Sequence, residues 1–164
     1  MSSRLKSCEN ESRICTSALD DEGHVLALAN TGKVALCAAG GKAYGVGLKS
    51  TKNLVTGVAA ANKSVAVLKK TTIAKVKVWV DNADPAIVIG DYVSMKGANA
   101  SGYAHDHEGT VLSSTPTKTE LDAQQDERAM IVGIALEAVA SPGSGETKTK
   151  IDVLLTCPSF GRQE

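Results

Sequence analysis

Aromatic side chains are scarce in this chain: its 164 residues include three Tyr, one Trp and one Phe. Grooves that bind single-stranded nucleic acid stack the bases against exposed aromatic faces, and sugar-binding sites use aromatic faces in the same way. The composition therefore argues against both classes of site, and we expect no nucleic-acid partner. The hydrophobic core must be built from Val, Ala, Leu and Ile instead.

Long apolar runs are also missing. No segment approaches the roughly eighteen uninterrupted apolar residues that a membrane-spanning helix needs. Residues 1–13 lack the apolar core of a signal peptide. We therefore expect no membrane partner and no export by a standard signal. The cysteines at positions 8, 15, 37 and 157 lack Cys-x-x-Cys spacing, which favours synthesis in a reducing cytoplasm.

Sequence motifs for catalysis are absent. The pairs Gly32-Lys33 and Gly41-Lys42 lack the following hydroxyl residue of a phosphate-binding loop, and no Gly-x-Ser-x-Gly elbow occurs. We expect no enzyme activity, no catalytic residue and no cofactor. As an alternative, His105 and His107 would share a face of a strand and bind a metal ion with ligands from elsewhere. A solvated loop explains the same residues, and we assign no metal site.

Acidic residues are missing from one long stretch of the chain. Between His24 and Val80 there is no Asp or Glu but there are nine lysines, and from Asp81 to Thr156 acidic residues outnumber basic ones. This division into a basic and an acidic half suits docking onto a partner of defined charge, or contacts between copies of the chain. A solvated lysine surface without a partner is the alternative.

Short runs rich in Val, Ile, Thr and Leu alternate with clusters of Gly, Asn, Asp and Ser. This pattern predicts an all-β fold made of small barrel or sandwich units. The clearest predicted strands span residues 73–80, 129–139 and 148–156. Residues 119–127 form either a short helix or a polar loop, because Thr119 and Asp122 have the spacing of a helix cap.

The two halves of the chain resemble each other in sequence. Residues 23–28 match residues 90–95 in their apolar pattern, and residues 44–49 match residues 132–137. We also match residues 72–78 with residues 150–155 as the closing strand of each half. A duplication predicts two related β units or one barrel with pseudo-twofold symmetry, whereas chance similarity is the alternative. The predicted organisation is an N-terminal arm (1–22), a basic first β unit (23–80), an acidic second β unit (81–157) and a C-terminal tail (158–164).

Three segments of the second half carry a resemblance to a known family. Residues 89–95 read Ile-Gly-Asp-Tyr-Val-Ser-Met, residues 131–140 read Ile-Val-Gly-Ile-Ala-Leu-Glu-Ala-Val-Ala, and residues 150–155 read Lys-Ile-Asp-Val-Leu-Leu. This series resembles the small β-barrel of the decoration (cement) proteins that coat the heads of tailed bacteriophages. The first half follows a looser version of it, in which Lys49 stands where the second half has Glu137.

The resemblance implies a virion structural protein that binds the outer surface of the major capsid lattice and stabilises the head. The partner would be the major capsid protein, the location the capsid exterior, and the oligomer a homotrimer or another small assembly. A head-fibre base or a tail component is the alternative within the virion.

The residues expected to contact a partner come from two places. Alternation within residues 73–80 puts two lysines on the wetter face of that strand, and neighbouring segments extend the basic stripe. The stripe comprises Lys33, Lys69, Lys70, Lys75 and Lys77. The polar arm adds Ile14 and Leu19, which would become ordered on the capsid or on a neighbouring subunit. A frayed terminus is the alternative for the arm.

Overall fold

The computed structural model describes residues 10–82, 86–98, 100–107, 109, 112–141 and 147–155. The regular secondary structure of these residues consists of strands and one helix, which confirms the all-β prediction. The elements, in chain order, are β1 (Asn10–Cys15), β2 (Val25–Leu28), β3 (Val34–Leu36), β4 (Gly45–Gly47), β5 (Lys63–Lys69), β6 (Ala74–Asn82), β7 (Tyr92–Ser94), β8 (His105–Asp106), α1 (Lys118–Met130), β9 (Ile131–Ala135) and β10 (Thr147–Leu155). The predicted C-terminal tail lies outside the described residues.

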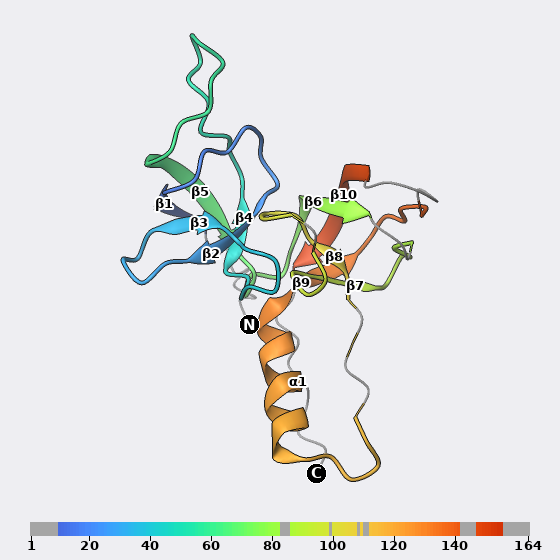
Figure 1. The fold of residues 1–164 in the computed structure, drawn as a ribbon. Coiled ribbons are helices and arrows are strands. Elements are labelled where there is room, and N and C mark those ends of the chain that lie inside the picture. The colour runs from blue at the N-terminus through green and yellow to red at the C-terminus, as the bar shows by residue number, and fades with distance from the viewer. Residues whose placement is uncertain are drawn as a thin grey trace, which may run out of the picture.

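The strands form two units that lie side by side (Figure 1). The first barrel is closed, with the strand order β1-β3-β2-β4-β5. The second sheet has the order β6-β10-β9-β7-β8. In the first barrel, β1 meets β3 in parallel through Cys15 and Val34. In the second sheet, a parallel bridge between Val80 of β6 and Ala104, which directly precedes β8, joins the two edge strands.

The register of the strands repeats between the two units. Leu26 of β2 lies opposite Gly45 of β4, and in the second sheet Val93 of β7 lies opposite Gly133 of β9. These are the residues that the sequence repeat aligns with one another. The two related halves are therefore visible in the pairing of the strands as well as in the sequence.

The turn that precedes each of these strands also repeats. Gly23 and Gly90 both have a positive φ, at 94° and 100°, a conformation that side chains rarely adopt. The amide of Gly23 donates to the carbonyl of Gly47 at 2.7 Å, and the amide of Gly90 donates to that of Ala135 at 2.9 Å. The same glycine turn thus starts β2 and β7.

The closing strand of the first half differs from the prediction. We matched residues 72–78 with residues 150–155, but β5 closes the first barrel by pairing with β4 and β1. Strand β6 pairs with β10 and belongs to the second sheet. Both β5 and β6 contain two lysines and several Val and Ala residues, so their composition does not reveal which neighbour each pairs with. The division between the units falls between β5 and β6, before the predicted boundary at residue 80.

The predicted N-terminal arm is corrected for its described part. Residues 10–15 form β1, which pairs with β5 along its whole length. The strand looks like a polar arm in the sequence because polar side chains make contacts on both of its faces. Ser12 and Ser64 share a hydrogen bond of 2.8 Å, and Arg13 donates to the carbonyl of Gly32 at 2.8 Å.

The helix is longer than predicted and starts with a different cap. α1 begins after Thr117, whose side chain accepts from the amide of Glu120 while the Glu120 carboxylate accepts from the amide of Thr117. This reciprocal arrangement satisfies two backbone donors that the helix itself leaves unpaired. In Figure 1, α1 projects away from both units.

One hydrophobic core is shared by the two units. Its buried side chains include Val25 and Val46 from the first barrel together with Val78 and Val153 from the second sheet. A smaller cluster, which contains Leu19 and Leu26, lies within the first barrel. Because the larger cluster crosses the junction, the two units are expected to unfold together.

Backbone hydrogen bonds also cross the junction. The amide of Trp79 donates to the carbonyl of Gly23 at 2.9 Å, and the amide of Val25 donates to that of Gly102 at 2.8 Å. The buried ring of His24 stacks on Trp79 and meets Tyr103 edge-on, with ring centroids 6.1 and 5.2 Å apart. The rings of His24, Trp79 and Tyr103 thus hold the two units against each other.

Gly45 and Gly133 allow neighbouring strands to approach more closely than any other residue permits. A Cβ atom on Gly45 would lie closer than 3.0 Å to the carbonyl oxygen of Leu68, and one on Gly133 would meet that of Leu154 in the same way. Neither oxygen can move without breaking its strand.

We therefore expect Gly45→Ala and Gly133→Ala each to lower the free energy of unfolding by about 2 to 3 kcal/mol, the usual cost of forcing extra atoms into a packed core. Urea denaturation followed by circular dichroism measures this. Gly109→Ala is the control, because no atom lies within 4 Å of its added Cβ. Equal denaturation midpoints for Gly45→Ala and the natural protein would contradict the close approach.

Candidate interaction surface

Two of the predicted docking lysines are neutralised by carboxylates of the same chain. Lys75 and Lys77 point out of β6, but both form ion pairs with Asp152 of β10, and the Lys77–Asp152 distance is 3.0 Å. Lys77 also pairs with Glu137 at 2.9 Å. The hydrogen bonds from Lys75 and Lys77 lower the pKa of Asp152, and the bond from Lys77 lowers the pKa of Glu137. This part of the basic stripe offers little net charge to a partner.

Lys69 belongs to a second polar cluster, which is half-buried in the first barrel on the face of β1 that also carries the buried Cys15. Its ammonium lies 3.0 Å from Glu11 of β1, and the Tyr44 hydroxyl donates to the same carboxylate at 2.5 Å. Arg13 forms a further ion pair with Glu11. These groups, led by the Tyr44 hydroxyl, lower the pKa of Glu11 to about 2. The cluster fastens β1 to its neighbours and explains the charges of a segment that looked like an arm.

Lys70 acts as a link between the two units. Its ammonium donates to the carbonyl of Ala129 at 2.6 Å and to that of Ile131 at 3.3 Å, at the C-terminal end of α1. A cation at this position satisfies carbonyls that the helix leaves free and complements the helix dipole. Lys70 therefore has a structural role that the sequence did not indicate.

Lys33 keeps its charge available, and three lysines outside the predicted set do the same. Lys33, Lys49, Lys52 and Lys63 are exposed, and none forms an ion pair with another residue in the described part of the chain. Cys15 pairs with Val34 on one side and with Lys63 on the other, so Lys33 and Lys63 lie at the same end of the barrel. We call these four lysines the basic end.

The connection between β4 and β5, residues 49–62, rises well clear of the first barrel (Figure 1). We call it the β4–β5 hairpin, because its two legs pair at Lys52 and Ala59. Its tip carries Leu54, Val55 and Val58, whose side chains are 97%, 93% and 65% exposed. Leu54 and Val55 are the most exposed of the large hydrophobic residues that the structure describes.

The base of this hairpin is fixed to the barrel. Thr51 is buried, its hydroxyl accepts from the amide of Leu19 at 2.8 Å, and its own amide donates to the Leu19 carbonyl at 2.8 Å. Leu19, expected to contact a partner, is fully buried in the barrel, whereas Ile14 of β1 is 40% exposed. Leu19 thus supports the hairpin from within.

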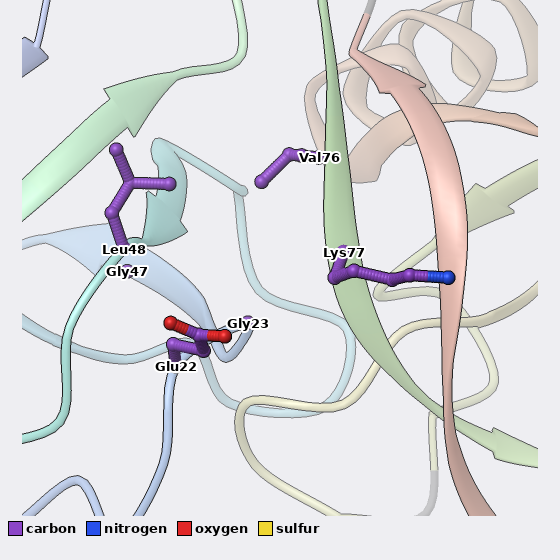
Figure 2. A pocket seen from close by; sticks show the side chains of 6 residues that line it. All are labelled: Glu22, Gly23, Gly47, Leu48, Val76 and Lys77. Atoms are coloured by element: carbon purple, nitrogen blue, oxygen red, sulfur yellow. The ribbon is translucent and has the colours of Figure 1, made fainter.

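A small hollow lies at the junction of the two units. It encloses about 190 Å³ and is lined by Glu22, Gly23, Gly47, Leu48, Val76 and Lys77. Figure 2 shows Leu48 on the first-barrel wall and Val76 on β6, while Lys77 points away from the hollow toward β10. The hollow presents two aliphatic side chains and one carboxylate, without a group positioned for chemistry.

The histidines considered for metal binding have separate partners. His105 is buried with its Nδ1 atom 3.0 Å from Asp81, which raises the pKa of His105, whereas burial lowers the pKa of His107. The Nδ1 atom of His107 lies 3.1 Å from the hydroxyl of Ser94. Among the residues that the structure describes, no group of three or more His, Cys, Asp or Glu side chains is placed to hold a metal ion.

Comparison with known protein families found no family that matches the chain, and comparison with curated proteins found no match either. Within the described ranges, no helix is both long and apolar enough to cross a membrane.

The hairpin tip is the feature that sequence reasoning missed. Residues 49–62 contain no alternating pattern, and Asn53, Thr56 and Gly57 indicate a turn, so the segment reads as an ordinary loop. The available signal was the placement of Leu54 and Val55 inside that turn, where polar residues are the rule.

We expect the acid sensitivity of the fold to depend on Glu11. Because its pKa falls from 4.5 to about 2 on folding, ionised Glu11 stabilises the folded state above pH 4.5, and the contribution is lost as the pH falls toward 2. Glu11→Gln should reduce the loss of thermal stability across this window, and Tyr44→Phe should reduce it less. Melting temperatures between pH 2 and pH 7 test this, and an unchanged profile for Glu11→Gln would contradict the assigned cluster.

Proposed function

We propose that the protein is a capsid decoration (cement) subunit of a tailed bacteriophage, which binds the outer surface of the major capsid lattice and stabilises the head. The three segments that resemble this family form neighbouring strands, because β9 lies between β7 and β10 in the second sheet. The first barrel repeats the same pairing. The resemblance thus corresponds to a complete structural unit that occurs twice in the chain.

One observation carries the choice of binding surface: among the residues that the structure describes, the basic end has no carboxylate partners, although most other lysines do. Within these residues, Lys69, Lys75 and Lys77 bind carboxylates, whereas Lys33 and Lys63 do not. Unpaired charges of one sign steer association with an oppositely charged surface. An acidic patch on the major capsid protein is the partner that this surface fits.

Self-association is part of the proposal. Weak contacts by single subunits become strong attachment when several subunits bind a repeating lattice together. A homotrimer would present three basic ends to the capsid. This arrangement requires no catalytic group, cofactor, nucleic acid or membrane.

Co-sedimentation with phage heads that lack the protein tests the proposal. We expect binding that weakens as salt rises, because exposed charges are screened. The double variant Lys33→Gln, Lys63→Gln should bind about threefold to tenfold more weakly per copy at low salt. Its matched control is Lys42→Gln, Lys118→Gln, which changes the net charge equally but removes lysines that pair with Asp126 and Asp122.

Equal weakening by both double variants would show that net charge, and not the basic end, governs attachment. No sedimentation of the natural protein with heads at any salt concentration would contradict the function itself. Electron microscopy of labelled protein on whole particles separates capsid faces from tails, and label confined to tails would favour a tail component instead.

A further inference from the structure

The tip of the β4–β5 hairpin exposes aliphatic side chains at an energetic cost. Burying a Leu or Val side chain is favourable relative to leaving it in water. Leu54 and Val55 forgo this almost entirely, since they are 97% and 93% exposed. Large apolar side chains presented together on a protruding element are typical of an interaction surface.

The tip has a defined shape. The side chain of Asn53 accepts from the amides of Val55 and Thr56 at 2.8 and 3.2 Å. The backbone of Asn53 donates to the carbonyl of Val58 at 2.9 Å and accepts from the amide of Gly57 at 2.8 Å. A tip that is already ordered loses little conformational entropy when it binds, which favours a partner with a preformed recess.

The positive charges near the tip indicate which charges should surround the recess on the partner. Lys49 and Lys52 lie on the first leg of the hairpin, Lys63 follows its second leg, and the hairpin itself contains no acidic residue. The pKa of Asp21 is lowered mainly by its hydrogen bond with Lys150, which lies 2.7 Å away, and to a smaller extent by the charge of Lys52. Asp21 is therefore paired with Lys150 and not with a lysine of the hairpin. An apolar recess bordered by carboxylates therefore complements the tip.

A protein recess fits better than a lipid surface. Segments that insert into lipid headgroups usually present an extended amphipathic face, whereas the tip is a short turn without an aromatic residue. Two adjacent aliphatic side chains on a narrow, rigid turn suit a pocket of side-chain size.

We propose that Leu54 and Val55 insert into an apolar recess rimmed by carboxylates on the major capsid protein. This inference rests on the proposed function and identifies the element that supplies the salt-resistant part of the attachment. The lysines guide the tip to the recess, and the aliphatic side chains hold it there. Such a contact differs from the screened charge attraction of the basic end, because burial of apolar surface is not weakened by salt.

The test compares two double variants in binding to phage heads that lack the protein. The tip variant, Leu54→Ser, Val55→Ser, removes the aliphatic side chains of the tip. The matched control, Ile73→Ser, Ile89→Ser, removes two aliphatic side chains elsewhere on the surface, which are 81% and 64% exposed. We expect the tip variant to bind at least about 30-fold more weakly per copy, as for a central interface residue, at both low and high salt. The control should bind like the natural protein, and both variants should melt at its temperature.

The outcomes separate the two proposals. Binding of the natural protein with no loss in the tip variant overturns the inference and leaves the decoration function standing. Failure of the natural protein to bind heads overturns both. Sedimentation equilibrium of the protein alone, and flotation with phosphatidylserine vesicles, complete the test. Self-association or vesicle binding that the tip variant abolishes would assign the tip to a second copy or to lipid, and would overturn the inference.

Discussion

In both units a glycine lets one strand lie directly against the backbone of the next. Gly45 meets the carbonyl of Leu68, and Gly133 meets that of Leu154. A side chain at either place would push the strands apart and open the sheet. The first barrel depends on this approach for the pairing of β4 with β5, which helps to close it. The hairpin between them projects from the barrel because both strands are held in place.

Much of this fold is predictable from the sequence. The alternation of β6 and the paired glycine segments indicate an all-β chain with an internal repeat, and the register of Leu26 with Gly45 matches that of Val93 with Gly133. The role of β1 is not predictable in this way. Its ladder with β5 is formed by backbone groups, and its contacts through Glu11 involve residues far away in the sequence.

The candidate site was harder to predict, because exposure and pairing are properties of the folded chain. Lysines on one face of β6 look like a docking surface until Asp152 is found beside them on β10. Lys70 looks similar but caps α1. Lys33 was identified from charge alone, and it remains unpaired among the described residues. The position of the hairpin tip depends on the hydrogen bond between Thr51 and Leu19, which fixes the base of the hairpin and joins residues that are far apart in the sequence.

We propose that the first barrel turns its basic end and its hairpin tip toward a capsid, while Lys75 and Lys77 of the second sheet are paired with Asp152 and Glu137. A cryo-EM map of decorated phage heads tests this most directly. The account predicts that the β4–β5 hairpin lies against the major capsid protein, with acidic side chains around Leu54 and Val55. A map in which the hairpin faces solvent and the second sheet contacts the capsid would contradict it.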